Sequence, residues 1–402
     1  MSHRSWTVFA CVAAVLVTVA GDLQAADKEA PKPQYEYGDF KVPAARGDEP
    51  LASQLDVGKA AAYLEQGNTA WNGARGCVSC HTNGTYMIVR PALTAQLGKP
   101  AEESRTFFVN TLKKLLEVDR EELKKSTKPA QVIYTAAGLA EWDAQVTGQL
   151  SGETRQALAL MFEIQDDAGT WGTLDCWPPY ESDAFHEATV AAMAAAAAPG
   201  WLTSLSQSPA EAPLLAKVQK LKNYLRTTPP PHDYGRTLLL WTATRMPDLL
   251  TADQKQSLVE MLWKHQREDG GWSIRTFAKP EAWGKGNRAA KLKQEPDFET
   301  PASDGHQTGL AIIVLRQSGV AANDPRLQKG VQWLLKNQRE SGRWWTRSLN
   351  TDSWHFITYS GTAFPLLALS LCDALPKTTA AAPVSAPSGS QIPAASRESG
   401  QP

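Results

Sequence analysis

The sequence predicts an all-α protein whose helices form two concentric layers, an apolar inner ring and an amphipathic outer ring. Three observations support this fold class. The 402-residue chain has almost no alternating strand pattern, many of its segments have helical periodicity, and a motif built around Gly and Trp recurs at predicted helix ends. Its content of 42% hydrophobic and 8% aromatic residues is sufficient for a large core.

The predicted helices alternate in character along the chain. Segments 211–226, 252–266 and 326–338 carry apolar residues on one face, which predicts outer helices, and the more apolar segments between them predict inner helices. In chain order, the predicted helices are 57–66, 104–118, 130–146, 152–165, 183–198, 211–226, 235–246, 252–266, 305–318, 326–338 and 360–374.

The pattern Q-x-x-x-G-x-W occurs at 165–171, 266–272 and 338–344, each time at the last turn of an amphipathic helix. Its Gly suits the left-handed conformation that ends a helix, because glycine has no Cβ to clash there. Its Trp can close over the helix end while the indole N–H finds an acceptor. Matches at equivalent helix ends predict repeated helical hairpins.

A second repeat reinforces the first. Thr189, Thr237, Thr308 and Thr362 each stand near the start of an apolar helix. Candidate N-caps precede three of these helices, and they are Ser182 or Asp183, Asp233, and Ser303 or Asp304.

These repeats resemble the squalene–hopene cyclase and prenyltransferase superfamily over roughly residues 130–375. The resemblance implies an α/α toroid of helical hairpins at 126–375. The cyclases protonate their substrate with an Asp of a D-x-D-D-T motif. Here the matching stretch keeps Asp304 and Thr308 but has His306 and Gln307 in place of the acidic pair. The resemblance thus implies the fold but not cyclisation by the acid route, and Asp304 and His306 are weak catalytic candidates.

The two ends of the chain predict export and a polar tail. Arg4, the uncharged run 6–20 and the small residues after it predict a signal peptide at 1–25 and an exported, periplasmic protein. A retained membrane anchor is the alternative, although the run is shorter than the roughly 20 residues that a span needs. Residues 26–50 are predicted as a linker, and the Ala/Pro/Ser-rich segment 376–402 as disordered.

The sharpest motif is Cys77-Val78-Ser79-Cys80-His81, because C-x-x-C-H is the attachment sequence of c-type haem. On a helix, the two cysteines would share one face and could form thioethers, and His81 would bind the iron as proximal ligand. We therefore predict a small helical haem-binding segment at 51–125 that carries covalent haem c.

Three alternatives compete with haem. The C-x-x-C pair could be a redox disulfide, half of a zinc site or a structural disulfide. The first lacks a βαβ context, the second lacks another cysteine pair, and the third leaves His81 unexplained. Cys176 and Cys372 could pair with each other or stay buried.

Other residues are candidates for the surroundings of the haem. Trp71 and Tyr86 could shield the macrocycle, and Arg90 could face a propionate. The sixth ligand stays open, either as an empty position or as one of Met87, Met161, Met193, His186, His306 and His355.

A formal charge of −1 gives no electrostatic reason to expect nucleic acid as a partner.

The sequence leaves several candidate functions. The first is an exported monohaem redox protein whose toroid binds a partner or a hydrophobic ligand, and the second is an enzyme acting on an isoprenoid or other apolar substrate. A structural scaffold with a filled centre is a third alternative. An open cavity would favour ligand or enzyme. The residues expected at the cavity are Trp177, Tyr180, His186, Asp304, His306, Trp354 and His355.

Overall fold

The computed structural model describes residues 32–173, 175, 177–180 and 183–375. The chain divides after Lys32, and the fold described below is that of the second unit. The predicted signal peptide, the predicted tail, Cys176 and Ser182 lie outside the described residues.

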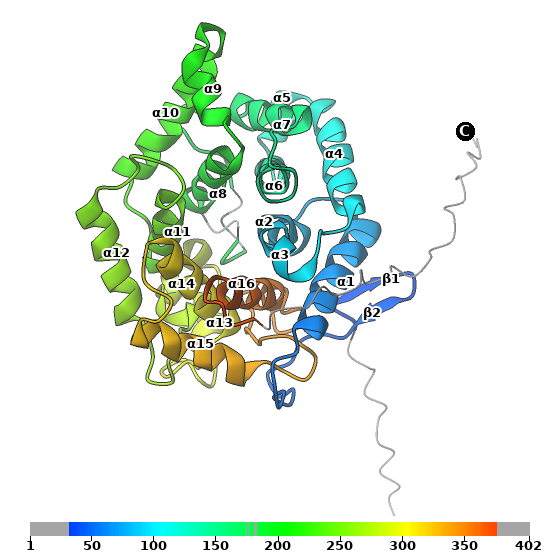
Figure 1. The fold of residues 1–402 in the computed structure, drawn as a ribbon, viewed down its shortest axis with the longest axis vertical. Helices are drawn as coiled ribbons and strands as arrows, with labels where there is room; N and C mark the ends of the chain where they lie inside the picture. The colour runs from blue at the N-terminus through cyan, green and yellow to red at the C-terminus, as the bar shows by residue number, and fades with distance from the viewer. Residues whose placement is uncertain (1–31, 174, 176, 181–182, 376–402) are drawn as a thin grey trace, which may run out of the picture. The chain divides into compact units, whose positions relative to one another are not determined.

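Helices of this unit form two rings (Figure 1). Along the chain an outer helix is followed by an inner one. The outer helices are α1 (Val57–Arg75), α4 (Glu102–Leu116), α7 (Gly152–Glu163), α10 (Ala212–Thr227), α12 (Ala252–Lys264) and α15 (Pro325–Asn337). The inner helices are α2 (Thr85–Val89), α6 (Lys128–Trp142), α8 (Ala184–Ala197), α11 (Asp233–Ala243), α14 (Gly305–Gln317) and α16 (Ile357–Leu371).

Short elements connect these helices. They are η1 (Cys80–Gly84), η2 (Arg90–Leu93), α3 (Thr94–Leu97), α5 (Arg120–Leu123), η3 (Asp143–Thr147), α9 (Trp201–Gln207), η4 (Pro209–Glu211), η5 (Ile274–Thr276), η6 (Pro280–Gly286) and α13 (Ala289–Lys293). Among the described residues no single helix is long and apolar enough to cross a membrane, although α8 and α9 together reach that length and composition with a bend of 79° between them.

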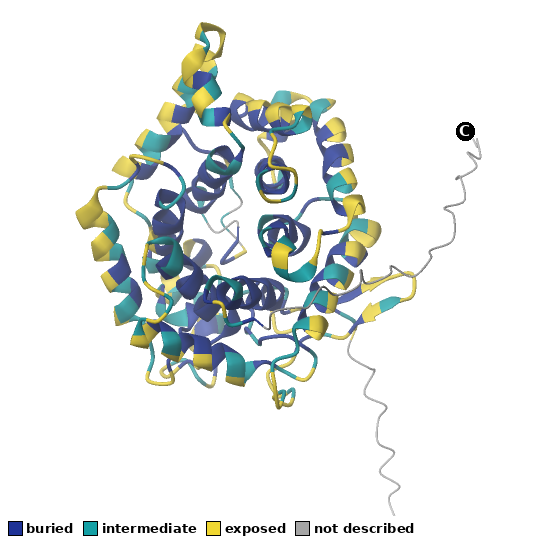
Figure 2. Cartoon of the chain, viewed as in Figure 1, coloured by how far each residue is buried: buried dark blue, intermediate teal, exposed yellow. Residues whose placement is uncertain are grey.

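Burial follows the two rings, as Figure 2 shows. Inner helices are buried on nearly all sides, and in α14 every residue from Gly305 to Leu315 is buried. Outer helices bury a stripe, which in α15 includes Leu327, Val331 and Leu334 at helical spacing. The predicted all-α fold with an apolar inner and an amphipathic outer layer is therefore confirmed.

The Gly–Trp motif ends the outer helices as predicted. Gly270 has a φ of 91°, in the left-handed region. Trp272 is fully buried, and its Nε1 donates to the Leu262 carbonyl at 2.7 Å. The Gln266 amide donates to the Gly270 carbonyl and, at 2.8 Å, to the Arg326 carbonyl of the next outer helix. Each motif thus seals one helix end and fastens it to the following hairpin.

The last motif closes the ring. Gln338 Nε2 donates to the Asp56 carbonyl at 2.9 Å, and its Oε1 accepts from the Asp56 N–H at 2.7 Å. A β-bridge joins Leu51 to Arg339 beside this contact. The final outer helix α15 is therefore bonded directly to the residues that begin α1.

Residues 51–125 are part of this ring. Helix α1 packs against α16, and α2 packs against both α16 and α6. The predicted haem-binding segment and the predicted toroid at 126–375 thus lie in one compact unit. Helix α1 extends to Arg75, well past the predicted end at 66, and α2 has no counterpart among the predicted helices.

Part of the predicted linker 26–50 is also structured. Strands β1 (Tyr35–Tyr37) and β2 (Phe40–Val42) form an antiparallel hairpin in which Tyr35 pairs with Val42. The side chain of Tyr35 is buried, and its ring lies 5.9 Å from that of Tyr359 on α16. This aromatic burial explains why the polar-looking segment is ordered here.

Candidate functional site

The C-x-x-C-H motif lies between α1 and α2, where the chain passes from the outer ring to the inner ring. Gly76 ends α1 in the left-handed conformation with a φ of 64°. Ser79 is extended, and only Cys80 and His81 enter the one-turn π-helix η1. The expectation that both cysteines share one helical face is therefore wrong, because the helix stops before Cys77.

Side-chain hydrogen bonds hold the motif in place of a helix. The Asn83 amide donates to the Cys77 carbonyl at 3.0 Å, and its oxygen accepts from the Ser79 N–H at 2.7 Å. Trp71 Nε1 also donates to the Cys77 carbonyl, at 3.1 Å. The loop that carries the first cysteine is thus fixed to both flanking elements.

The two thiols differ in exposure. Cys80 is buried, whereas Cys77 is half-buried and burial raises the pKa of its thiol. No disulfide joins Cys77, Cys80 or Cys372, and Cys176 lies outside the described residues. Within the described part of the chain, no group of three or more His, Cys, Asp or Glu residues is placed to hold a metal ion as a zinc site would require.

His81 is held by three neighbours. Its ring stacks on Phe356 of the segment leading into α16 at 4.8 Å and meets the ring of Trp71 edge-on at 4.6 Å. Its Nδ1 is hydrogen-bonded to Thr82 Oγ1 at 2.8 Å. Burial lowers the pKa of His81 to about 4, so the imidazole is neutral at pH 7. When Nδ1 donates to Thr82, Nε2 keeps the lone pair with which a neutral imidazole binds a metal.

Two of the predicted flanking residues face elsewhere. Tyr86 is fully buried and donates to Glu65 of α1 at 2.5 Å. Arg90 is also buried, with Nε donating to Glu65 at 2.7 Å and Nη1 donating to the Gly98 carbonyl at 2.9 Å. The interpretations of Tyr86 as a haem shield and of Arg90 as a propionate partner are therefore wrong, because Glu65 engages both side chains.

A cavity of about 40 Å³ lies inside the inner ring. Most of its wall is apolar, and three tyrosines, His186, two threonines and the carboxylate of Glu141 complete it. The wall includes Thr85, Ile88, Tyr134, Ala137, Tyr180, His186, Val190, Met193, Tyr234, Leu238, Trp241 and Phe364.

Tyrosine and histidine side chains form a hydrogen-bonded cluster at this cavity. The Tyr134 hydroxyl is bonded to His186 Nε2 at 3.1 Å, and the Tyr234 hydroxyl to His306 Nε2 at 3.2 Å. His306 Nδ1 is bonded to the hydroxyl of Ser360 at 2.7 Å, which in turn is bonded to Tyr180.

Burial keeps the cluster neutral. It lowers the pKa of His186 to about 4 and that of His306 to about 3, and it raises the pKa of Tyr234 well above its usual value. At pH 7 the cluster therefore offers neutral hydrogen-bonding groups and no strong acid.

Asp304, the carboxylate of the cyclase-like stretch, caps a helix. Its Oδ1 accepts from the Gln307 N–H at 2.9 Å at the start of α14, and its Oδ2 accepts from the Ile274 N–H at 2.7 Å. Burial raises its pKa to about 6. Asp304 is not among the residues that line the cavity, whereas His306 belongs to the cluster beside it.

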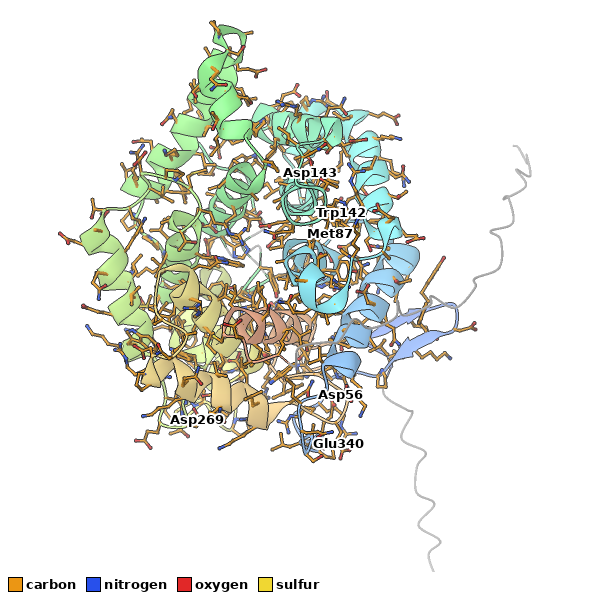
Figure 3. The ribbon with its side chains drawn as sticks, in the orientation of Figure 1. Asp56, Met87, Trp142, Asp143, Asp269 and Glu340 are labelled. Carbon is orange, nitrogen blue, oxygen red and sulfur yellow. The ribbon has the colours of Figure 1, made fainter. Side chains whose placement is uncertain are left out.

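Several other predicted residues lie away from the cavity. Met87 is fully buried and packs closely against Gly138 of α6, because a Cβ atom built on that glycine would lie 2.7 Å from the Cβ of Met87. Figure 3 labels Met87 and Trp142 of the same helix α6. Met161 is buried on the outer helix α7. His355 Nδ1 accepts from the Ser348 N–H at 2.9 Å. Trp177 and Trp354 remain 44% and 43% exposed.

Tyr180 and His186 line the cavity as predicted, whereas sequence reasoning missed Tyr134, Tyr234 and Ser360. A signal was available, because His186 and Tyr234 each stand three residues before a recurring Thr, and His306 and Ser360 stand two residues before one. Tyr134 lies on a helix without that Thr, so no pattern marks it.

Two comparisons with known proteins bear on the fold. Residues 232–373 match the family model of the squalene–hopene cyclase C-terminal domain. The terpene cyclase–glycosyl transferase fusion protein fsoA of Humicola fuscoatra is 34% identical over 118 residues, which are 28% of this chain but only 7% of that protein. The chain thus has an all-α, terpene cyclase-like fold, and its part at 232–373 is similar to the C-terminal domain of squalene–hopene cyclases.

Proposed function

We propose that this is an exported redox protein that carries one covalent haem c at the edge of a squalene cyclase-like toroid. Cys77 and Cys80 would form the thioethers, and His81 would be the proximal ligand. The observation that carries the proposal is the fixed, neutral imidazole of His81, with Nδ1 bonded to Thr82, directly after the two cysteines. With Nδ1 donating to Thr82, Nε2 would present the lone pair with which a histidine binds a metal.

The residues around the motif have defined roles in this proposal. Asn83 fixes the loop of Cys77, while Phe356 and Trp71 set the plane of the His81 ring. When bound, the haem would supply one-electron chemistry at its iron. A half-buried Cys77 beside a buried Cys80 places the motif at the boundary between solvent and the inner ring, which suits electron exchange with a partner protein.

Expression in a host that matures c-type cytochromes tests the proposal. We expect a red protein whose haem remains on the polypeptide through denaturing electrophoresis. His81→Ala should change the absorption spectrum while the covalent attachment persists. The double change Cys77→Ala and Cys80→Ala should abolish attachment, and Cys372→Ala is the matched control. A colourless wild-type protein, or haem that acid–acetone extracts, would refute the proposal.

A second candidate function is the binding of a hydrophobic or isoprenoid molecule within the toroid, with or without catalysis. The matched family points to isoprenoid chemistry, and the largely apolar cavity wall favours such a ligand. Its size weighs against it, because even benzene occupies an engineered cavity of about 150 Å³, whereas this cavity measures about 40 Å³. Such a ligand would therefore require the inner ring to open.

A further inference from the structure

The central cavity contains a buried carboxylate that the proposed function does not use. Glu141 of α6 is 2% exposed and lines the cavity. Its Oε1 accepts from Arg245, but its Oε2 has no hydrogen-bond partner among the described residues. A buried ion pair is tolerated when its remaining lone pairs are also satisfied, so the open oxygen requires a donor.

The same cavity contains a second open atom. His186 of α8 is 4% exposed and also lines the cavity. Its Nε2 is bonded to the Tyr134 hydroxyl at 3.1 Å, whereas its Nδ1 has no partner in the part of the chain that the structure describes. One ring nitrogen of a neutral imidazole donates and the other accepts, so Nδ1 needs an acceptor or a donor according to the tautomer.

The two open atoms lie at different levels of the cavity. Tyr134, which holds His186, and Glu141 are both on α6 and are seven residues apart (141 − 134 = 7). At about 1.5 Å per residue, this is about 10 Å along the helix axis. Ala137 lies between them on α6 and adds an apolar part of the wall. One very small molecule therefore cannot reach both atoms, whereas a short row of such molecules can.

The size and polarity of this space favour water. The cavity measures about 40 Å³, and one water requires roughly 10–15 Å³, so about three waters fit. Water can donate to Glu141 and can either donate to or accept from His186, whereas an apolar molecule would satisfy neither. A metal ion is disfavoured because Arg245 already neutralises Glu141 and because no group of three ligands is found among the described residues.

We propose that the central cavity is an internal hydration site, in which a short chain of waters joins the carboxylate of Glu141 to the imidazole of His186. The waters satisfy both open atoms and connect α6 to α8 through the centre of the ring. They also extend the hydrogen bond between Tyr134 and His186 toward Arg245, whose side chain is 19% exposed. This inference goes beyond the proposed function and does not depend on haem attachment.

A crystal structure of the wild-type protein, at a resolution that resolves ordered waters, tests the proposal directly. We expect one water within hydrogen-bonding distance of Glu141 Oε2, another within that distance of His186 Nδ1, and a continuous row between them. Water at one end only, a cavity without water, or a cavity filled by a ligand of another kind would overturn the proposal.

Oxygen-17 relaxation dispersion, which counts long-lived internal waters in solution, compares two conservative variants. Val190→Ile adds one methyl group to the cavity wall and should remove at least one long-lived water. It should also lower the melting temperature, because an open atom loses its partner. Val218→Ile is the matched control, since it makes the same change at a buried valine of the outer helix α10, and it should leave the count unchanged.

An unchanged count of long-lived waters in Val190→Ile would overturn the proposal. A raised melting temperature of that variant would then show that the added methyl group fills a dry apolar space.

Discussion

At the scale of the single residue, the buried carboxylate of Asp304 caps a helix at the position where the resemblance to the cyclases would imply an acid. Asp304 accepts two backbone N–H groups at the start of α14, so both of its oxygens are engaged. Its pKa nevertheless rises to about 6 because burial outweighs these hydrogen bonds. The same side chain thus links the stability of the fold to pH.

We expect Asp304→Asn to alter the pH dependence of stability. The folded-state pKa of about 6 exceeds the unfolded value of 3.8, so the folded state binds the proton more tightly. The stability contributed by this proton is fully present below pH 3.8 and is lost as the pH rises through 6. The unfolding free energy of the wild type minus that of the variant should therefore be about 2 kcal/mol larger at pH 4 than at pH 7. Urea unfolding at both pH values measures it, and an equal difference at the two would contradict the argument.

At the scale of the element, sequence patterns predict those helices whose ends and buried faces are determined by residues close together in the chain. The Gly–Trp motifs and the recurring Thr predict most of the outer and inner helices, because capping and apolar periodicity act within a few residues. Helix α2 was not predicted, because Pro91 follows it and the chain continues in the short elements η2 and α3. The contact of His81 with Phe356 depends on how the ring closes, and no local pattern encodes it.

Gly270→Ala tests the helix-ending role of the motif. A Cβ there would lie 2.7 Å from the Lys329 carbonyl oxygen, and the φ of 91° already disfavours any side chain. Gly319→Ala is the matched control, because Gly319 has a similar φ of 95° but nothing within 4 Å of its added Cβ. Both changes should cost about 1 kcal/mol for the left-handed backbone. Gly270→Ala should lose more, because the backbone of α15 must shift; equal melting temperatures would show that the close approach does not matter.

At the scale of the whole molecule, closure of the ring is a specific event. Gln338 is buried and bonds both backbone groups of Asp56, and Figure 3 labels Asp56 near Glu340 beside this contact. The Glu340 N–H also donates to the Pro50 carbonyl at 2.9 Å. These bonds join the last outer helix to the first hairpin.

Gln338→Ala should destabilise the protein by about 2 kcal/mol, because it leaves the Asp56 N–H and the Gly342 carbonyl without their side-chain partner, while the Asp56 carbonyl keeps only the Ala60 N–H. Gln266→Ala removes the equivalent amide within the ring, where its bond to Arg326 is exposed, and should cost about 1 kcal/mol. Chemical unfolding of both variants compares them. A smaller loss for Gln338→Ala than for Gln266→Ala would mean that closure contributes little.

The whole molecule also argues against cyclisation of squalene by acid catalysis. Asp304 is bound as a helix cap, His306 is neutral with both ring nitrogens bonded, and the cavity measures about 40 Å³. Protonation of an alkene demands a strong acid facing a large apolar space. Incubation with squalene should therefore yield no cyclic triterpene. Products that disappear in Asp304→Asn would refute this expectation.

The meeting of the first and last hairpins also fixes an order of events during synthesis. Phe356, against which the His81 ring stacks, lies 275 residues after it in the chain (356 − 81 = 275). The cysteines therefore emerge from the ribosome long before the segment that later covers His81 has been made. If the proposed haem attachment holds, a chain that is truncated before α16 and exported should therefore already accept haem at these cysteines.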